Sequence, residues 1–155
     1  MRSIAHLLIP LASVVFLISG TAVWAGKIVR NPNGSTVETR DDGAEIITNT
    51  DKSSVETRRN GTKIITNADG SSVETRLDGT EIIRNPDKSS VETRRNGTKI
   101  VTNADGSSIE TRKNGLELVK NADGSSVQTN PDGSKLIINA DGTTERVKPK
   151  KKGEK

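Results

Sequence analysis

The chain contains no cysteine and no tyrosine, and its only tryptophan, phenylalanine and histidine all lie within residues 1–25. The remainder therefore has no thiol or imidazole with which to build a metal site, and it can form no disulfide. It also has no aromatic ring on which a nucleic-acid base or a sugar would stack. From this composition we predict no cofactor and no nucleic-acid partner.

Net positive charge is confined to the C-terminal end, because lysine and arginine elsewhere are balanced by acidic residues. The formal net charge is +4, and residues 148–155 alone, KPKKKGEK, carry five lysines against one glutamate. The high isoelectric point is thus a property of this tail and not of a basic binding surface. We interpret residues 148–155 as a disordered basic tail that hinders strand addition at an open sheet edge. Weak attraction to anionic polymers or lipid headgroups is the alternative.

Long hydrophobic runs are absent except near the N-terminus. The run from Leu7 to Ser19 follows a positive residue, Arg2, and is short for a membrane span. Val23 and Ala25 are small residues at the positions that a signal peptidase reads. We predict a signal peptide over residues 1–25, cleaved after Ala25, and therefore a secreted or periplasmic protein without a stable membrane span. An uncleaved anchor is the alternative.

What the chain does contain is a repeat of 18 residues, exemplified by NADGSSVETRLDGTEIIR at residues 67–84. Each half of the repeat has an Asp-Gly or Asn-Gly pair, then Ser or Thr, then a run rich in Val, Ile and Thr. This arrangement predicts β-hairpins with two-residue type I′ turns, in which glycine adopts a positive φ. The turn glycines are Gly61, Gly70, Gly79, Gly97, Gly106, Gly115 and Gly124. Lys52 and Lys88 replace glycine in two turns, where we expect distorted or widened geometry.

Two-residue turns fix the strand register by arithmetic, so that Thr75 faces both Ile64 and Ile82. The predicted fold is all-β: a repetitive antiparallel meander over residues 26–147 that forms an extended single-layer sheet of about 14 strands, wet on both sides. On one strand Glu74 and Arg76 share a face and neutralise each other. A calcium-binding β-roll is a less favoured alternative, because each nine-residue unit has only one glycine. The predicted row across one face, and our candidate interaction face, is Thr57, Ile64, Thr75, Ile82, Thr93, Ile100 and Thr111.

No residue pattern indicates catalysis. Acids such as Glu74 and Glu92 are repeated, exposed and partnered by arginine, without a second layer to form a pocket. We therefore predict an exported structural or protein-interaction module rather than an enzyme. It would bind a protein partner or self-associate through open edge strands near Lys27–Arg30 and Thr143–Val147, or through the Thr/Val/Ile face. The alternative is a protein that binds ice, mineral or polysaccharide through regular threonine rows.

The tandem pattern xADGSSVETRxDGTxIIx resembles the C-terminal G-box domain of the T-complex protein 10 and centriole-assembly family, over about residues 27–147. The resemblance implies a free-standing antiparallel sheet of glycine-turn repeats that is exposed on both faces. It further implies that the sheet binds a proline-rich partner segment and associates end to end. The implied sheet agrees with the meander that the turn spacing predicts independently.

Overall fold

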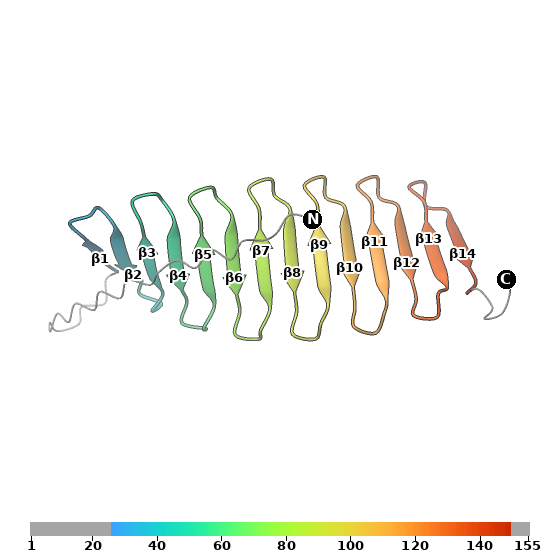
Figure 1. Cartoon of the computed structure of the whole chain (residues 1–155), viewed down its shortest axis with the longest axis horizontal. Coiled ribbons are helices and arrows are strands. Elements are labelled where there is room, and N and C mark those ends of the chain that lie inside the picture. The colour runs from blue at the N-terminus through green and yellow to red at the C-terminus, as the bar shows by residue number, and fades with distance from the viewer. Residues whose placement is uncertain (1–25, 150–155) are drawn as a thin grey trace.

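The computed structural model describes residues 26–149, which form one open sheet of fourteen antiparallel strands in sequence order (Figure 1). Every strand pairs only with its neighbours in sequence. The all-β, single-layer meander predicted above is therefore confirmed. The strands are β1 (Lys27–Arg30), β2 (Thr36–Thr39), β3 (Glu45–Thr48), β4 (Ser54–Thr57), β5 (Lys63–Thr66), β6 (Ser72–Thr75), β7 (Glu81–Arg84), β8 (Ser90–Thr93), β9 (Lys99–Thr102), β10 (Ser108–Thr111), β11 (Glu117–Lys120), β12 (Ser126–Thr129), β13 (Lys135–Ile138) and β14 (Thr144–Val147).

The described residues contain no helix, so none of them provides a helical segment long and apolar enough to cross a membrane. The predicted signal peptide over residues 1–25 lies outside the described residues. Most of the predicted tail, from residue 150 onward, lies outside them as well.

The turns are one residue longer than predicted. Between β6 and β7, the Gly79 N–H donates to the Arg76 carbonyl at 3.0 Å, and the Arg76 N–H donates to the Thr80 carbonyl at 2.9 Å. Gly79 has φ 83°, whereas neither Leu77 nor Asp78 has a positive φ. This is a three-residue loop, a type I turn followed by a left-handed glycine. The predicted positive φ of all seven turn glycines is confirmed, but the predicted type I′ turns are wrong.

The longer turn moves the register by one residue throughout the sheet. Thr75 pairs with Glu81 and Lys63, while Ile82 pairs with Glu74. Side chains alternate between the two faces along a strand. When the register shifts by one residue, a side chain therefore shares its face with a different set of side chains on the neighbouring strand. The predicted pairing of Thr75 with Ile64 and Ile82 is therefore wrong, although the strands themselves are in the predicted places.

Lys52 and Lys88 do not widen their turns, contrary to the prediction. Both residues adopt φ 70° and take the place that glycine holds elsewhere. The Lys52 N–H donates to the Asn49 carbonyl at 3.0 Å, and Lys88 makes the same bond to Asn85 at 3.0 Å. The surrounding ladder thus holds lysine in the left-handed region, at a cost of about 1–2 kcal/mol per residue.

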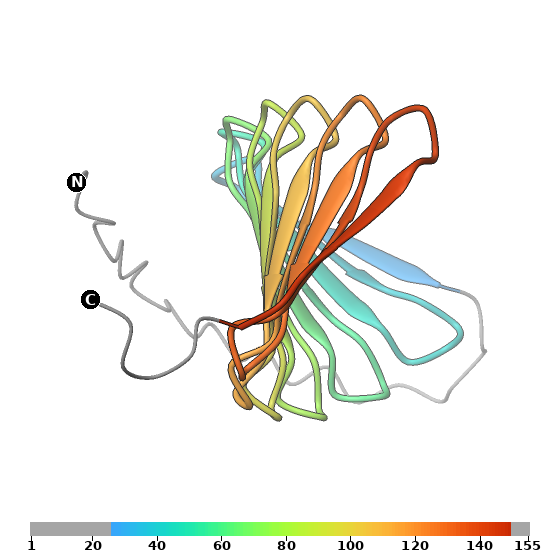
Figure 2. The same ribbon diagram turned by 90° about the vertical axis from the view of Figure 1, so that its right-hand side faces the viewer.

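The sheet has almost no buried interior. Among the described residues the only buried apolar side chains are Ala44 and Ile82, at 2% and 7% exposure. Figure 2 shows the strand direction rotating steadily from β1 to β14, as expected for a right-handed strand twist. Stability must therefore come from many small cross-strand terms of roughly 0.2–1 kcal/mol each.

Candidate interaction surfaces

One face of the sheet carries an unbroken line of valine and isoleucine, which we call the aliphatic row. Each member pairs directly with the next across thirteen strands, from β1 to β13, until Glu145 replaces an aliphatic residue in β14. All of its members are half-buried or exposed. The row consists of Val29, Val37, Ile47, Val55, Ile65, Val73, Ile83, Val91, Val101, Ile109, Val119, Val127 and Ile137. We call this side of the sheet the aliphatic face.

A second line on the aliphatic face lies two residues away along each strand. It alternates threonine with a charged residue, and the charges alternate between lysine and glutamate from one odd-numbered strand to the next. None of these charges forms an ion pair within residues 26–149. This Thr/charge row consists of Lys27, Thr39, Glu45, Thr57, Lys63, Thr75, Glu81, Thr93, Lys99, Thr111, Glu117, Thr129 and Lys135.

The predicted interaction face is divided between the two sides of the sheet. Its threonines, Thr57, Thr75, Thr93 and Thr111, lie in the Thr/charge row, whereas its isoleucines, Ile64, Ile82 and Ile100, lie on the opposite face. The mixed row is therefore wrong, and the extra turn residue is the reason. A charged side chain also separates each threonine from the next, so the structure gives no support to a regular threonine surface for ice, mineral or polysaccharide.

The opposite face, which we call the ionic face, carries a line in which isoleucine or leucine alternates with glutamate, until Gln128 and Arg146 replace glutamate in β12 and β14. Glu74 pairs with Ile64 and Ile82 in the ladder. Its Oε1 accepts from Arg76 Nε at 2.6 Å, and its Oε2 accepts from Arg84 Nη1 at 2.9 Å. The predicted neutralisation of Glu74 by Arg76 is confirmed. Glu74 is buried, at 7% exposure, so the prediction that it is exposed is wrong. The Arg76 hydrogen bond is the largest influence on its carboxyl and, with the Arg84 hydrogen bond, lowers the pKa although burial opposes the shift.

The same Glu–Arg contact recurs at Glu56–Arg58, Glu92–Arg94 and Glu110–Arg112, with oxygen–nitrogen distances of 2.6–2.7 Å. The charges of the ionic face are thus largely satisfied within the sheet itself. Those of the Thr/charge row have no such partners within residues 26–149.

The turns are closed by side-chain networks that sequence reasoning missed. Asn67 Nδ2 donates to Ser71 Oγ at 2.9 Å, and Ser71 Oγ donates to Asp69 Oδ1 at 2.7 Å. The Ser71 N–H also donates to Asp69 Oδ1, at 2.9 Å. The sequence signal for these networks is the presence of Asn, Asp and Ser at the first, third and fifth positions of the turn.

These networks predict that the sheet loses stability in acid. The Ser71 hydroxyl is the main reason that the pKa of Asp69 is lowered, and serine or threonine hydroxyls act likewise on Asp51, Asp87, Asp105, Asp123, Asp132 and Asp141. A carboxyl whose pKa is lower in the folded state stabilises the fold above its unfolded pKa of about 3.9. That contribution disappears as pH falls through the folded value.

We therefore expect the urea midpoint to be steady from about pH 7 to about pH 5 and to fall below about pH 4. Far-ultraviolet circular dichroism would follow the transition. Ser71→Ala removes the hydroxyl donor and should reduce the acid-dependent part of the loss. A midpoint that stays unchanged down to about pH 2.5 would show that these hydrogen bonds contribute nothing to folding.

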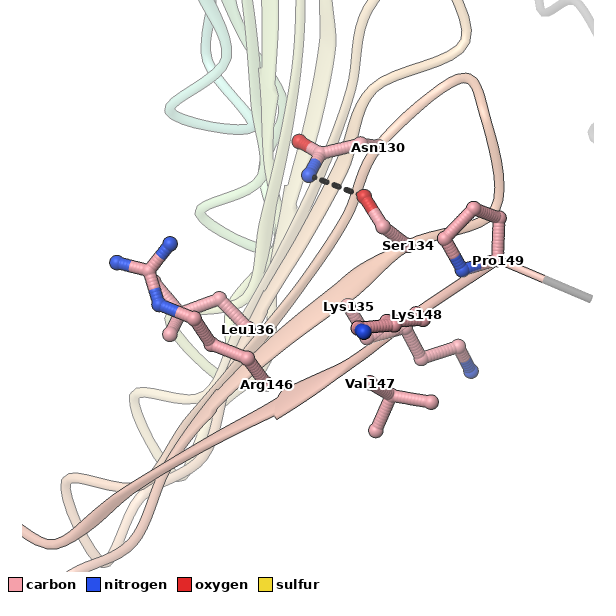
Figure 3. Close-up of a pocket in the computed structure, with 8 residues that line it drawn as sticks. All are labelled: Asn130, Ser134, Lys135, Leu136, Arg146, Val147, Lys148 and Pro149. Carbon is pink, nitrogen blue, oxygen red and sulfur yellow. Dashed lines mark hydrogen bonds between the residues drawn. The ribbon is translucent and has the colours of Figure 1, made fainter.

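Pockets offer little for catalysis in residues 26–149. One is a hollow of about 290 Å³ at the C-terminal edge. Figure 3 shows Leu136 and Arg146 together on one side of it and the Asn130–Ser134 hydrogen bond, 2.9 Å long, above them. A larger hollow of about 670 Å³ lies between the turns at residues 49–53 and 67–69. No group of His, Cys, Asp and Glu in the described residues is arranged to hold a metal ion.

The two open edges are β1 and β14, whose residues are all exposed. Because the Asn31 N–H donates to the Ser35 carbonyl, the alternation of an antiparallel ladder directs the N–H and C=O groups of Ile28 and Arg30 away from β2. The same reasoning directs those of Thr144 and Arg146 away from β13. Both edges can accept an added strand.

No family model and no curated protein matches the sequence. Solved structures do match. The G-box domain of the microcephaly protein CPAP, for which a role in centriole elongation is suggested, is 27% identical, with 80% of this chain and 82% of that chain covered and a TM-score of 0.62. The TCP10c domain of Drosophila melanogaster Sas-4 is 26% identical, with 79% and 92% covered and a TM-score of 0.62.

This sheet resembles a G-box domain. The resemblance inferred from the repeat sequence is thereby confirmed. The TCP10 domain of Danio rerio CPAP, solved in complex with a peptide of Danio rerio STIL, is 26% identical, with 84% of this chain and 74% of that chain covered and a TM-score of 0.51.

The predicted secreted or periplasmic location is wrong. The structures that the sheet resembles belong to the centriole-assembly proteins CPAP and Sas-4, which are intracellular. The prediction rested on the apolar run in residues 1–25, which lies outside the described part of the chain. The composition of that run says nothing about the sheet that follows it.

Proposed function

We propose that this chain is a protein-interaction module whose aliphatic face binds an extended segment of a partner protein, and that it acts by binding and not by catalysis. The uninterrupted aliphatic row is the observation that carries the proposal. Contiguous apolar surface exposed to solvent marks interaction sites, whereas single exposed apolar residues are ordinary and need no explanation. The STIL peptide bound to the similar TCP10 domain of Danio rerio CPAP supports a protein segment as the class of partner.

The spacing of the row suits a polyproline II segment lying across the strands. One 18-residue repeat spans two strands, which places equivalent side chains about 9.6 Å apart. A polyproline II helix advances about 9.3 Å in each turn of three residues. Every third residue of such a segment would therefore meet the same surroundings in successive repeats. Its fixed backbone also loses little conformational entropy on binding.

The two open edges support a second mode, in which a partner strand or another copy of the chain adds to the sheet. The outward N–H and C=O groups of Ile28 and Arg30 in β1 provide the hydrogen bonds for it. This mode requires no contact with the aliphatic row, and the two are separable by mutation.

The test compares two double variants that change neighbouring residues on opposite faces. Ile65→Lys with Val101→Lys alters the aliphatic row, whereas Ile64→Lys with Ile100→Lys alters the ionic face in the same strands, β5 and β9. All four side chains are half-buried. Lysine at Ile64 would face Glu56 and Glu74, so the control variant should remain folded.

Crosslinking in host cells, followed by mass spectrometry, would measure which proteins each variant retains. We expect the aliphatic variant to lose its specific partner by at least tenfold, or about 1.4 kcal/mol, because a lysine would be desolvated at the centre of the contact. The ionic-face variant should keep the partner. If both variants retain the partner equally and circular dichroism is unchanged, the proposal for the aliphatic face is overturned. The open edge strands would then be the remaining candidate for the binding site.

A further inference from the structure

The charges beside the aliphatic row follow a pattern twice as long as the sequence repeat. Odd-numbered strands present Lys27, Glu45, Lys63, Glu81, Lys99, Glu117 and Lys135, so the sign reverses at every repeat. Each of these residues is exposed. The sheet itself does not need this alternation, because the direct cross-strand neighbours of these residues are threonines or, for Lys135, also Val147.

A segment that lies on the aliphatic row would also contact the charged side chains of the neighbouring Thr/charge row. A polyproline II helix has three ridges of side chains, because it has three residues per turn. With one ridge on the aliphatic row, a second ridge lies over the Thr/charge row. Successive residues of that second ridge, about 9.3 Å apart, would meet lysine and glutamate in turn, about 9.6 Å apart. The mismatch is only about 1 Å over four repeats.

We infer that the aliphatic face selects an extended partner segment whose charges alternate in sign at every third residue. Acidic side chains of the segment meet Lys63 and Lys99, and basic side chains meet Glu81 and Glu117. This inference rests on the proposed function, since it specifies the ligand of the same surface. A segment with its like charges grouped together would place at least one pair of like charges in contact wherever it docked along the row.

The probes are two synthetic peptides of identical composition. One is two copies of Pro-Pro-Asp-Pro-Pro-Lys, and the other is Pro-Pro-Asp-Pro-Pro-Asp-Pro-Pro-Lys-Pro-Pro-Lys. Binding to the full chain would be measured by isothermal titration calorimetry at low salt. We expect the alternating peptide to bind about tenfold more tightly, because each exposed ion pair contributes modestly and several act together. Added salt should remove most of the difference.

A charge variant provides the matched control. Lys63→Glu with Lys99→Glu makes five consecutive charges of the row acidic, from Glu45 to Glu117, and should remove the preference for the alternating peptide. It should create a preference for a peptide with lysine at every third position. Lys52→Glu with Lys88→Glu makes the same change in net charge at the turns and should leave the preference intact.

The outcomes separate the two proposals. Equal binding of both peptides, abolished by Ile65→Lys with Val101→Lys, would overturn the charge pattern and retain the aliphatic face. A preference that persists in Lys63→Glu with Lys99→Glu would also overturn it. Failure of every peptide to bind would count against the proposed function itself, because the surface would then accept no polyproline II segment.

Discussion

Replacement of Val73 by proline should cut the sheet in two without unfolding either part. Val73 lies in β6, and the ladder alternation set by the Asn67–Ser71 bond directs its N–H to the carbonyl of Ile65 in β5. Proline removes that donor and leaves the carbonyl without its partner, which costs about 3 kcal/mol together with the steric conflict of the ring. We expect this to be among the most damaging single substitutions in the described chain.

The expected response is local because contacts between strands are only between neighbours. A sheet of this kind is quasi-one-dimensional, so its stability is approximately a sum of repeat and neighbour terms. Native-state hydrogen exchange should show that amides of β5 to β7 lose protection, while those of β1 to β3 and β10 to β12 keep most of theirs. Urea unfolding should broaden or become biphasic.

Thr144→Pro is the matched control for this prediction. Thr144 pairs with Ile138 at a position where its N–H points away from β13, so proline removes no hydrogen bond of the sheet. Its urea midpoint should change little. If Val73→Pro instead unfolds all fourteen strands in one sharp transition, the sheet is a single cooperative unit and neighbour-only contacts do not describe its energetics.

The repeat sequence predicts most of the architecture because its signals are local. The 18-residue period, the Asp-Gly and Asn-Gly pairs and the β-branched runs place the strands and limit the fold to a meander. They do not determine turn length, since Asp-Gly suits both a two-residue type I′ turn and a three-residue loop that ends in left-handed glycine. What the three-residue loops share is an aspartate or asparagine whose Oδ1 accepts the N–H of the residue two positions later, as Asp69 accepts from Ser71. The same bond forms where that later residue is Ala44 or Leu116, so the acceptor and not the serine or threonine is the common feature.

The one extra residue in each turn decided which side chains meet at the candidate site. With two-residue turns, threonine and isoleucine would share a row; with three-residue loops, isoleucine meets glutamate and the aliphatic row becomes continuous. The aliphatic row was therefore hidden from sequence reasoning even though every residue in it was recognised as a strand former. The alternation of lysine and glutamate at every eighteenth residue, from Lys27 to Lys135, is visible in the sequence. Its position opposite the threonines and beside the aliphatic row depends on the register and was not.

The last position of the loop requires a left-handed backbone conformation, which glycine provides in most loops and lysine in two. Replacement of glycine there by valine should be costly. Gly79 has φ 83°, and a Cβ there would meet Arg95 Cβ at 3.6 Å, which is ordinary contact. The cost is therefore conformational: a β-branched residue in the left-handed region should reduce the free energy of unfolding by about 2 kcal/mol. Gly79→Asn should cost less, because asparagine tolerates this region.

Lys88 offers the reverse experiment at an equivalent turn. It already holds φ 70° with the same hydrogen bond to the carbonyl three residues earlier, 3.0 Å long. Lys88→Gly should therefore raise the free energy of unfolding by about 1 kcal/mol. Urea titrations followed by far-ultraviolet circular dichroism would compare the three variants with the wild type. If Gly79→Val proves no worse than Gly79→Asn, the loop does not require the left-handed conformation at residue 79. The register would then be maintained by the hydrogen bond from the Thr80 N–H to Asp78 Oδ1, which is 2.8 Å long.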